Sequence, residues 1–197
     1  MRVRFGTQNM TEGPVTDALR ACDAVALQEI PHRSAIIGGF GAGWRFYFPA
    51  QDSHQCLGWK TSVFDRAGGG ESWRFHRSGK ADPKIPDKVR TPSRWLHMQP
   101  LKVEDIEVPI DLYGTWAINS WNPFRADQWT EIRRWLFVDR TWPVIEREMT
   151  ASNNLGHLAL LGGDLNSVRA RLGIEGFRSF PRRGLDRQFY PRDPRIK

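Results

Sequence analysis

The sequence predicts an α/β or α+β fold, because short apolar segments that suit β-strands alternate with segments that suit helices. Residues 3–7 alternate apolar with polar or glycine positions, which is the period of a half-buried strand. Two short apolar runs, 24–27 and 157–161, are each followed closely by polar side chains. The stretch 127–147 spaces its large apolar residues roughly as a helix does.

The length and composition suit one globular domain with a basic surface. The chain has 197 residues, and we expect a single domain over residues 1–197. Hydrophobic residues make up 40%, which places the chain among globular rather than disordered proteins. The formal net charge of +7 comes mostly from arginine, which suits bidentate contacts with phosphate. Such a surface favours polyanions, with solubility alone as the plainer explanation.

The cysteines and the apolar runs indicate the cellular compartment of the protein. Cys22 and Cys56 lie far apart in the sequence, which favours free thiols in a reducing compartment. No apolar run approaches the ~20 residues that a transmembrane helix needs. The segment Met1–Phe5 has no signal-peptide character and suits a first strand. We therefore expect a cytoplasmic protein without a membrane span.

The N-terminal half is expected to hold strands and one short helix. A strand is expected to run from residue 2 to residue 7 and to end at Gln8, Asn9 and Met10. The further elements expected are a helix at 16–22 capped by Thr16 or Asp17, a buried strand at 24–27, aromatic-rich strands at 45–48 and 56–60, a glycine loop at 38–43 and a glycine turn at 68–70.

The C-terminal half is expected to begin with a mobile, basic, proline-rich loop at 76–94. Pro143 is expected to break or restart the helix that follows. The elements expected here are strands at 94–103 and 108–118, a helix or helix pair at 127–147, and a buried strand that ends at Leu161 because Gly162 and Gly163 stop it.

A carboxylate and a carboxamide follow those two glycines. Asp164 and Asn166 are two positions apart, so in an extended segment their side chains lie on the same side. Asp164 can act as a general base on water, and the Asn166 amide can donate to a developing oxyanion. The alternative is an Asx-type turn that closes the strand.

Polar residues also stand at the ends of other expected strands. Glu29 follows a buried strand, where a metal ligand or catalytic acid is often found; the alternative is an exposed strand-end charge. The full set is Asn9, Glu29, Asp164, Asn166 and Asp186. These residues suit one cleft rimmed by loops between packed sheets. Carboxylates gathered there would hold Mg²⁺ and support phosphodiester hydrolysis.

The order of these motifs resembles the endonuclease/exonuclease/phosphatase superfamily, which includes DNase I and exonuclease III. The matching segments are Gly-Thr-Gln-Asn-Met at 6–10, Ala-Leu-Gln-Glu at 26–29, Tyr-Gly-Thr-Trp-Ala-Ile at 113–118, Gly-Asp-Leu-Asn at 163–166 and Arg-Gly-Leu-Asp-Arg at 183–187. The resemblance spans nearly the whole chain. It implies an α/β sandwich of two packed mixed sheets flanked by helices, as in DNase I.

The resemblance also implies a role for each matched residue. Glu29 would be the ligand of Mg²⁺ or Mn²⁺, and Asp164 the base. Asn9 and Asn166 would contact phosphate, and Asp186 would support the family's catalytic histidine. We expect substrate contacts from Arg94, Arg169, Arg183, Arg187 and Trp116.

The sequence departs from the family in two places. Trp116 stands where the family often has His or Tyr, and an indole cannot relay a proton. The family's terminal Ser-Asp-His motif is not found before Lys197, so we expect a sandwich that lacks its last strand. Arg187 can stabilise a phosphorane charge but is no general acid at neutral pH. None of the five histidines takes a family position: His32, His54, His76, His97 and His157.

Three functions are consistent with these motifs. The first is a monomeric, divalent-metal-dependent nuclease, either an endonuclease or an exonuclease, that binds DNA. The second is a catalytically impaired relative that binds nucleic acid or a protein partner. The third is a phosphatase of a small phosphoester or phosphoinositide, since a shared fold does not fix the chemistry. Loss of one acid–base group removes about 10²–10⁴-fold of rate, so weak activity is compatible with the missing histidine.

Overall fold

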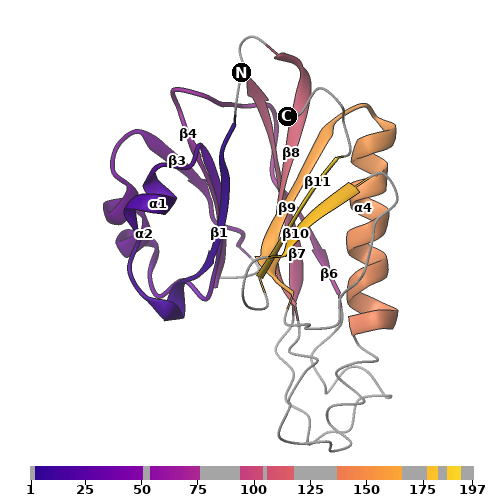
Figure 1. The fold of residues 1–197 in the computed structure, drawn as a ribbon, viewed down its shortest axis with the longest axis horizontal. Coiled ribbons are helices and arrows are strands. Elements are labelled where there is room, and N and C mark those ends of the chain that lie inside the picture. The colour runs from indigo at the N-terminus through magenta and orange to yellow at the C-terminus, as the bar shows by residue number, and fades with distance from the viewer. Residues whose placement is uncertain are drawn as a thin grey trace, which may run out of the picture.

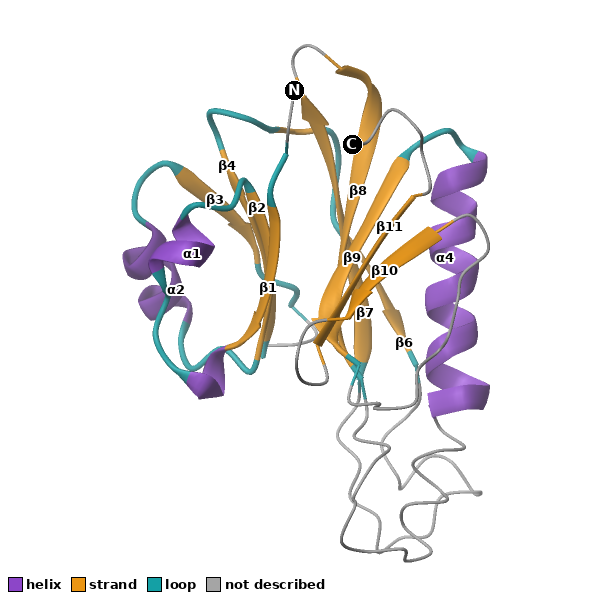
Figure 2. Cartoon of the chain, in the orientation of Figure 1, coloured by secondary structure: helices purple, strands orange, loops and turns teal. Residues whose placement is uncertain are grey.

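Two β-sheets pack face to face and carry helices on their outer sides (Figure 1). The structure, a computed structural model, describes residues 3–50, 54–75, 94–103, 106–117, 137–165, 177–181 and 186–191. Helices α1 and α2 cover one sheet, and α4 lies against the other (Figure 2). This architecture confirms the predicted two-sheet α/β sandwich.

The first sheet has 4 strands in the order β1-β2-β4-β3. Strands β1 and β2 are parallel, and the other pairs are antiparallel. The strands are β1 Phe5–Asn9, β2 Ala24–Gln28, β3 Trp44–Tyr47 and β4 Gln55–Lys60. A 3₁₀ turn at Met10–Glu12, helix α1 at Asp17–Arg20 and helix α2 at Arg33–Phe40 connect them.

The second sheet has 7 strands, in the order β10-β11-β9-β8-β7-β5, with β6 also paired to β7. Its strands are β5 Asp65–Arg66, β6 Glu71–Arg74, β7 Trp95–Val103, β8 Ile106–Trp116, β9 Leu158–Asp164, β10 Phe177–Pro181 and β11 Asp186–Pro191. Strands β8 and β9 are parallel neighbours, joined through helix α4 at Trp142–Asn154. Because β11 is hydrogen-bonded to both β10 and β9, no open edge runs along the strand that carries Asp186.

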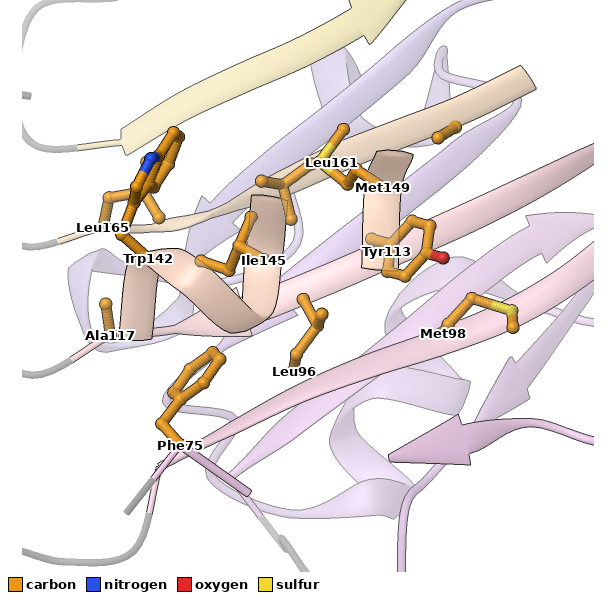
Figure 3. Packing of buried hydrophobic residues seen from close by; sticks show 11 residues of the cluster. Phe75, Leu96, Met98, Tyr113, Ala117, Trp142, Ile145, Met149, Leu161 and Leu165 are labelled. Atoms are coloured by element: carbon orange, nitrogen blue, oxygen red, sulfur yellow. The ribbon is translucent and has the colours of Figure 1, made fainter. Parts of the chain in front are cut away.

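Side chains alternate between the two faces of the second sheet, as the period of a strand requires. Leu112 of β8 faces the first sheet and packs with Ala26 and Leu57. Tyr113 faces the opposite way, towards Met149 of α4 (Figure 3). The residues near the end of β8 and β9 that face the first sheet therefore lie between the two sheets.

The strand before Asp164 is longer than the sequence predicted. We expected Gly162 and Gly163 to stop it, but β9 runs through both to Asp164, so this prediction is wrong. A Cβ atom at Gly162 would lie 2.6 Å from Cζ of Phe5 on the facing sheet. A Cβ atom at Gly163 would lie 2.2 Å from the carbonyl oxygen of Thr115 on the neighbouring strand. Gly162 thus allows the first sheet to approach β9 closely, and Gly163 allows the backbone of β8 to do so; neither glycine makes a turn.

Most of the other expected elements are confirmed. The hydroxyl of Thr16 accepts a hydrogen bond from the Leu19 amide and caps α1. Pro143 lies in the first turn of α4 and restarts the helix there, although the helix continues beyond Arg147. Helix α2 was missed, because its two glycines at 38 and 39 indicated a loop. The segment 118–136 lies outside the described residues.

The described cysteines and helices agree with the sequence expectations. Cys22 and Cys56 are both free thiols. Burial raises the pKa of the Cys56 thiol, so this side chain stays protonated at neutral pH. Among the described residues, no helix is long and apolar enough to cross a membrane.

Candidate active site

Asn9 ends β1 with its carboxamide held in one orientation. Its Oδ1 atom accepts hydrogen bonds from the Thr11 amide at 3.1 Å and the Thr11 hydroxyl at 2.9 Å. Its Nδ2 atom donates to Oε1 of Glu29 at 2.8 Å. The oxygen of the amide is therefore occupied by the 3₁₀ turn, and its N–H groups point towards carboxylates.

Glu29 reaches Asn9 through an unusual backbone conformation. Val25 and Leu27 of β2 pack under the helices on the outer side of the sheet, and simple alternation would aim Glu29 the same way. The φ angle of Glu29 is instead 52°, in the left-handed region. This turn brings the carboxylate back to the side chain of Asn9. A non-glycine residue in that region stores about 1–3 kcal/mol of strain, a feature often found at functional positions.

Asp164, from the second sheet, lies beside the same amide nitrogen of Asn9. It is the last residue of β9, and only 6% of its surface is exposed. Its Oδ2 atom lies 3.5 Å from Nδ2 of Asn9. One amide nitrogen is thus placed between two carboxylates, one from each sheet. Glu29, Asn9 and Asp164 converge although the sequence separates them widely.

The register of the second sheet aligns three predicted site residues in one row. Trp116 of β8 is the direct partner of Asp164, and Asp186 of β11 is its partner on the other side. The Ala117 amide donates to the carbonyl oxygen of Asp164 at 2.8 Å, which fixes the end of β9 against β8. Asp186 therefore stands at a backbone position adjacent to Asp164.

Trp116 is contacted by two further side chains. The guanidinium carbon of Arg94 lies 3.2 Å from the centre of the indole, and Arg94 is buried. The imidazole of His54 meets the indole edge to face, with ring centres 6.0 Å apart. The His54 carbonyl accepts from the Ile30 amide, directly after Glu29. No motif places His54 here, and it is the pairing of β2 with β4 that brings its imidazole to this position.

The remaining predicted site residues lie partly or wholly outside this description. Only the strand positions of Asp186 and Arg187 are described, and their side chains are not. Asn166, Arg169 and Arg183 lie outside the described residues. The same holds for the predicted basic loop at 76–94, except for Arg94.

The donor set fits a hard divalent cation. In the part of the chain that the structure describes, no three His, Cys, Asp or Glu side chains gather at one point. Glu29 and Asp164 nevertheless place two carboxylates around one amide. Mg²⁺ is usually held by one or two carboxylates, together with water and substrate phosphate. Glu29 is therefore a protein ligand of the kind that Mg²⁺ or Mn²⁺ takes, with Asp164 as a second carboxylate beside it.

Comparison by sequence finds no relative, because no family model and no curated protein matches this chain. Solved structures do match. The catalytic domain of human Nocturnin, with bound sulfate anion, has a TM-score of 0.64 at 12% identity over 98% of this chain and 84% of its own. An endonuclease/exonuclease/phosphatase from Bacteroides vulgatus has a TM-score of 0.64 at 13% identity over 98% of this chain and 88% of its own.

A third match is TDP2 from D. rerio complexed with single-strand DNA product, with a TM-score of 0.62 at 11% identity over 99% of this chain and 86% of its own. The fold is therefore that of the endonuclease/exonuclease/phosphatase proteins, which confirms the resemblance first indicated by the motifs. At identities this low, the similarity establishes the fold alone.

Proposed function

We propose that this chain is a divalent-metal-dependent phosphodiesterase that acts on nucleic acid, with DNA as the first candidate. The observation that carries the proposal is the amide of Asn9, which lies between the carboxylates of Glu29 and Asp164. Two carboxylates brought together from two sheets, on a fold shared with nucleases and phosphatases, are suited to phosphoester hydrolysis.

The residues divide the chemistry between them. Glu29 would hold the cation, which supplies charge to polarise a phosphoryl oxygen when it is bound. Asp164, buried and adjacent, would orient a water molecule and accept its proton as it attacks phosphorus. Asn9 would orient the two carboxylates, and its proposed contact with a phosphate oxygen would replace the longer of its two N–H contacts, the one with Asp164. The proposed role of Asn166 is a second amide contact with the same phosphate.

Charge and one structural match favour DNA as the substrate. The net charge of +7, mostly from arginine, favours a polyanion over a small phosphoester. D. rerio TDP2, which shares the fold, is known in complex with a single-strand DNA product. We assign substrate contacts to Arg169, Arg183 and Arg187, with Trp116 supported by Arg94.

Two observations bear on the identity of the substrate and on the level of activity. A mannosyl-6-phosphatase from Bacteroides thetaiotaomicron shares the fold, with a TM-score of 0.57 at 14% identity over 87% of this chain and 72% of its own. A small phosphoester is therefore the second candidate substrate. Trp116 lies next to Asp164 and cannot relay a proton, which favours a lower activity than a site with His or Tyr at this position would have.

The test is metal-dependent cleavage of DNA by the purified chain, with supercoiled plasmid and a single-stranded oligomer as the two substrates. We expect cleavage in Mg²⁺, no cleavage in EDTA, and a loss of about 10²–10⁴-fold in Asp164→Ala. Asp65→Ala, which removes an exposed carboxylate from β5, is the matched control and should keep the wild-type rate. Equal cleavage by Asp164→Ala and wild type would contradict the proposal, as would hydrolysis of sugar phosphates alone.

A further inference from the structure

Trp116 and Asp164 lie side by side on the same face of the second sheet. They are direct partners in the parallel pairing of β8 with β9, so their side chains project in the same direction. Neighbouring strands are about 4.8 Å apart. The indole therefore stands one strand away from the carboxylate that we assign as the base.

The indole is held from two directions. The guanidinium of Arg94 lies against its face, at 3.2 Å from the ring centre. Since only 9% of Arg94 is exposed, its guanidinium lies within the protein and not on the surface. His54 contacts the indole edge to face at 6.0 Å. Trp116 itself is half-buried, so part of its surface remains exposed.

A fixed, partly exposed indole beside two carboxylates suits one kind of ligand. It carries no positive charge and offers one N–H group, so it is a poor phosphate contact. Aromatic side chains are, however, the usual surfaces on which unpaired nucleobases stack. A ring that is immobilised before binding loses little conformational entropy when the base arrives.

We infer that Trp116 is the stacking surface for the nucleobase adjacent to the scissile phosphate, and that the substrate is single-stranded nucleic acid. Arg94 and His54 are positioning residues that fix the indole and do not themselves contact the base. A base in a duplex is already stacked and paired, whereas a single strand leaves its faces free. The inference rests on the proposed function and names the substrate class of the same site.

The test compares binding of two single-stranded oligomers in EDTA, where metal-dependent cleavage is prevented. One is fluorescein-labelled oligothymidylate, and the other has the same length but carries abasic tetrahydrofuran residues. Wild type should bind the oligomer with bases more tightly, and each stacked base contributes about 5- to 150-fold. Trp116→Leu should reduce this ratio by at least about fivefold, whereas Trp116→Phe should keep most of it.

Trp44→Leu is the matched control. Trp44 also has a cation beside its ring, with Lys60 Nζ 5.7 Å from the ring centre, but it packs with Phe40 and Phe46 under the helices of the first sheet. Its replacement should leave the ratio at the wild-type value. Equal binding of both oligomers by wild type, or an unchanged ratio in folded Trp116→Leu, would overturn the inference.

A second measurement separates this inference from the proposed function. In Mg²⁺, cleavage of both oligomers at equal rates with equal affinity would overturn the stacking and leave the phosphodiesterase assignment intact. A preserved binding ratio without cleavage of any diester would overturn the phosphodiesterase assignment and leave the stacking intact. Thermal unfolding of Trp116→Leu beside Trp116→Phe establishes that each variant is folded.

Discussion

Asn9 and Asp164 belong to different sheets, yet Nδ2 of Asn9 lies 3.5 Å from Oδ2 of Asp164. The same nitrogen donates to Glu29 at 2.8 Å. The NH₂ group of Asn9 is the contact described between the two carboxylates. The chemistry of the site therefore depends on an amide rather than a carboxylate at position 9.

Asn9→Asp should make the stability of the protein depend on a divalent cation. A third carboxylate would face Glu29 and Asp164, and like charges at about 4 Å repel by about 1–4 kcal/mol. We expect a lower melting temperature than wild type in EDTA, and a larger rise on addition of Mg²⁺. Asn153→Asp, an exposed change on α4, serves as the control. Identical Mg²⁺ responses of Asn9→Asp and wild type would argue against a cation between these side chains.

A comparison of Glu29→Gly with Glu29→Ala should separate the effect of backbone strain on stability from the effect of the lost carboxylate on hydrolysis. Both remove the carboxylate and should reduce hydrolysis to the same low level. Because the φ angle is 52°, glycine is free of the strain that alanine keeps. We expect Glu29→Gly to be more stable than Glu29→Ala by about 1 kcal/mol in urea unfolding. The reverse order of stability would show that the left-handed backbone of Glu29 is not a feature of the folded protein.

Gly163→Ala should distort the candidate site by displacing the strand that carries Asp164. The new Cβ atom would lie 2.2 Å from the backbone oxygen of Thr115, so β8 and β9 must move apart beside Asp164. We expect a loss of about 1–3 kcal/mol in stability and a reduced rate of hydrolysis. Gly69→Ala is the control, since a Cβ atom there meets nothing within 4 Å. Wild-type stability in Gly163→Ala would contradict the extended course of β9.

DNA binding should weaken steeply with salt. Each phosphate neutralised by the protein contributes about −0.9 to the slope of log affinity against log salt on duplex DNA, and about −0.7 on single strands. The double variant Arg169→Gln and Arg183→Gln should make the slope shallower by about 1.4 to 1.8. Fluorescence anisotropy of labelled DNA across a salt series measures this slope. A slope near zero in wild type would exclude phosphate contacts as the source of affinity.

Much of the fold and the centre of the site could be predicted from the sequence. The apolar run before Gln28 and the run before Asp164 both form buried strands. Polar residues at the ends of such strands meet only if the two sheets pack together, and the order of the motifs made that arrangement the expected one.

Other features depend on information that a single sequence does not carry. A pair of glycines before Asp164 is compatible both with a turn and with a closely packed strand. The close approach of Phe5 and Thr115 to Gly162 and Gly163 shows that these glycines belong to a strand. The positions of His54 and Arg94 around Trp116 follow from strand register and tertiary packing. Periodicity predicts which face a residue takes but not which distant residue lies opposite.

The most direct test of the central claim is the dependence of oligothymidylate cleavage on Mg²⁺ concentration for wild type and Glu29→Gln. Glutamine keeps the size of the side chain and removes the charge that we assign to cation binding. We predict a saturable rise of the wild-type rate with Mg²⁺, and for Glu29→Gln a rate that stays near background at every concentration. Cleavage by wild type that persists in EDTA, or a Glu29→Gln curve that overlies the wild-type curve, would contradict the account.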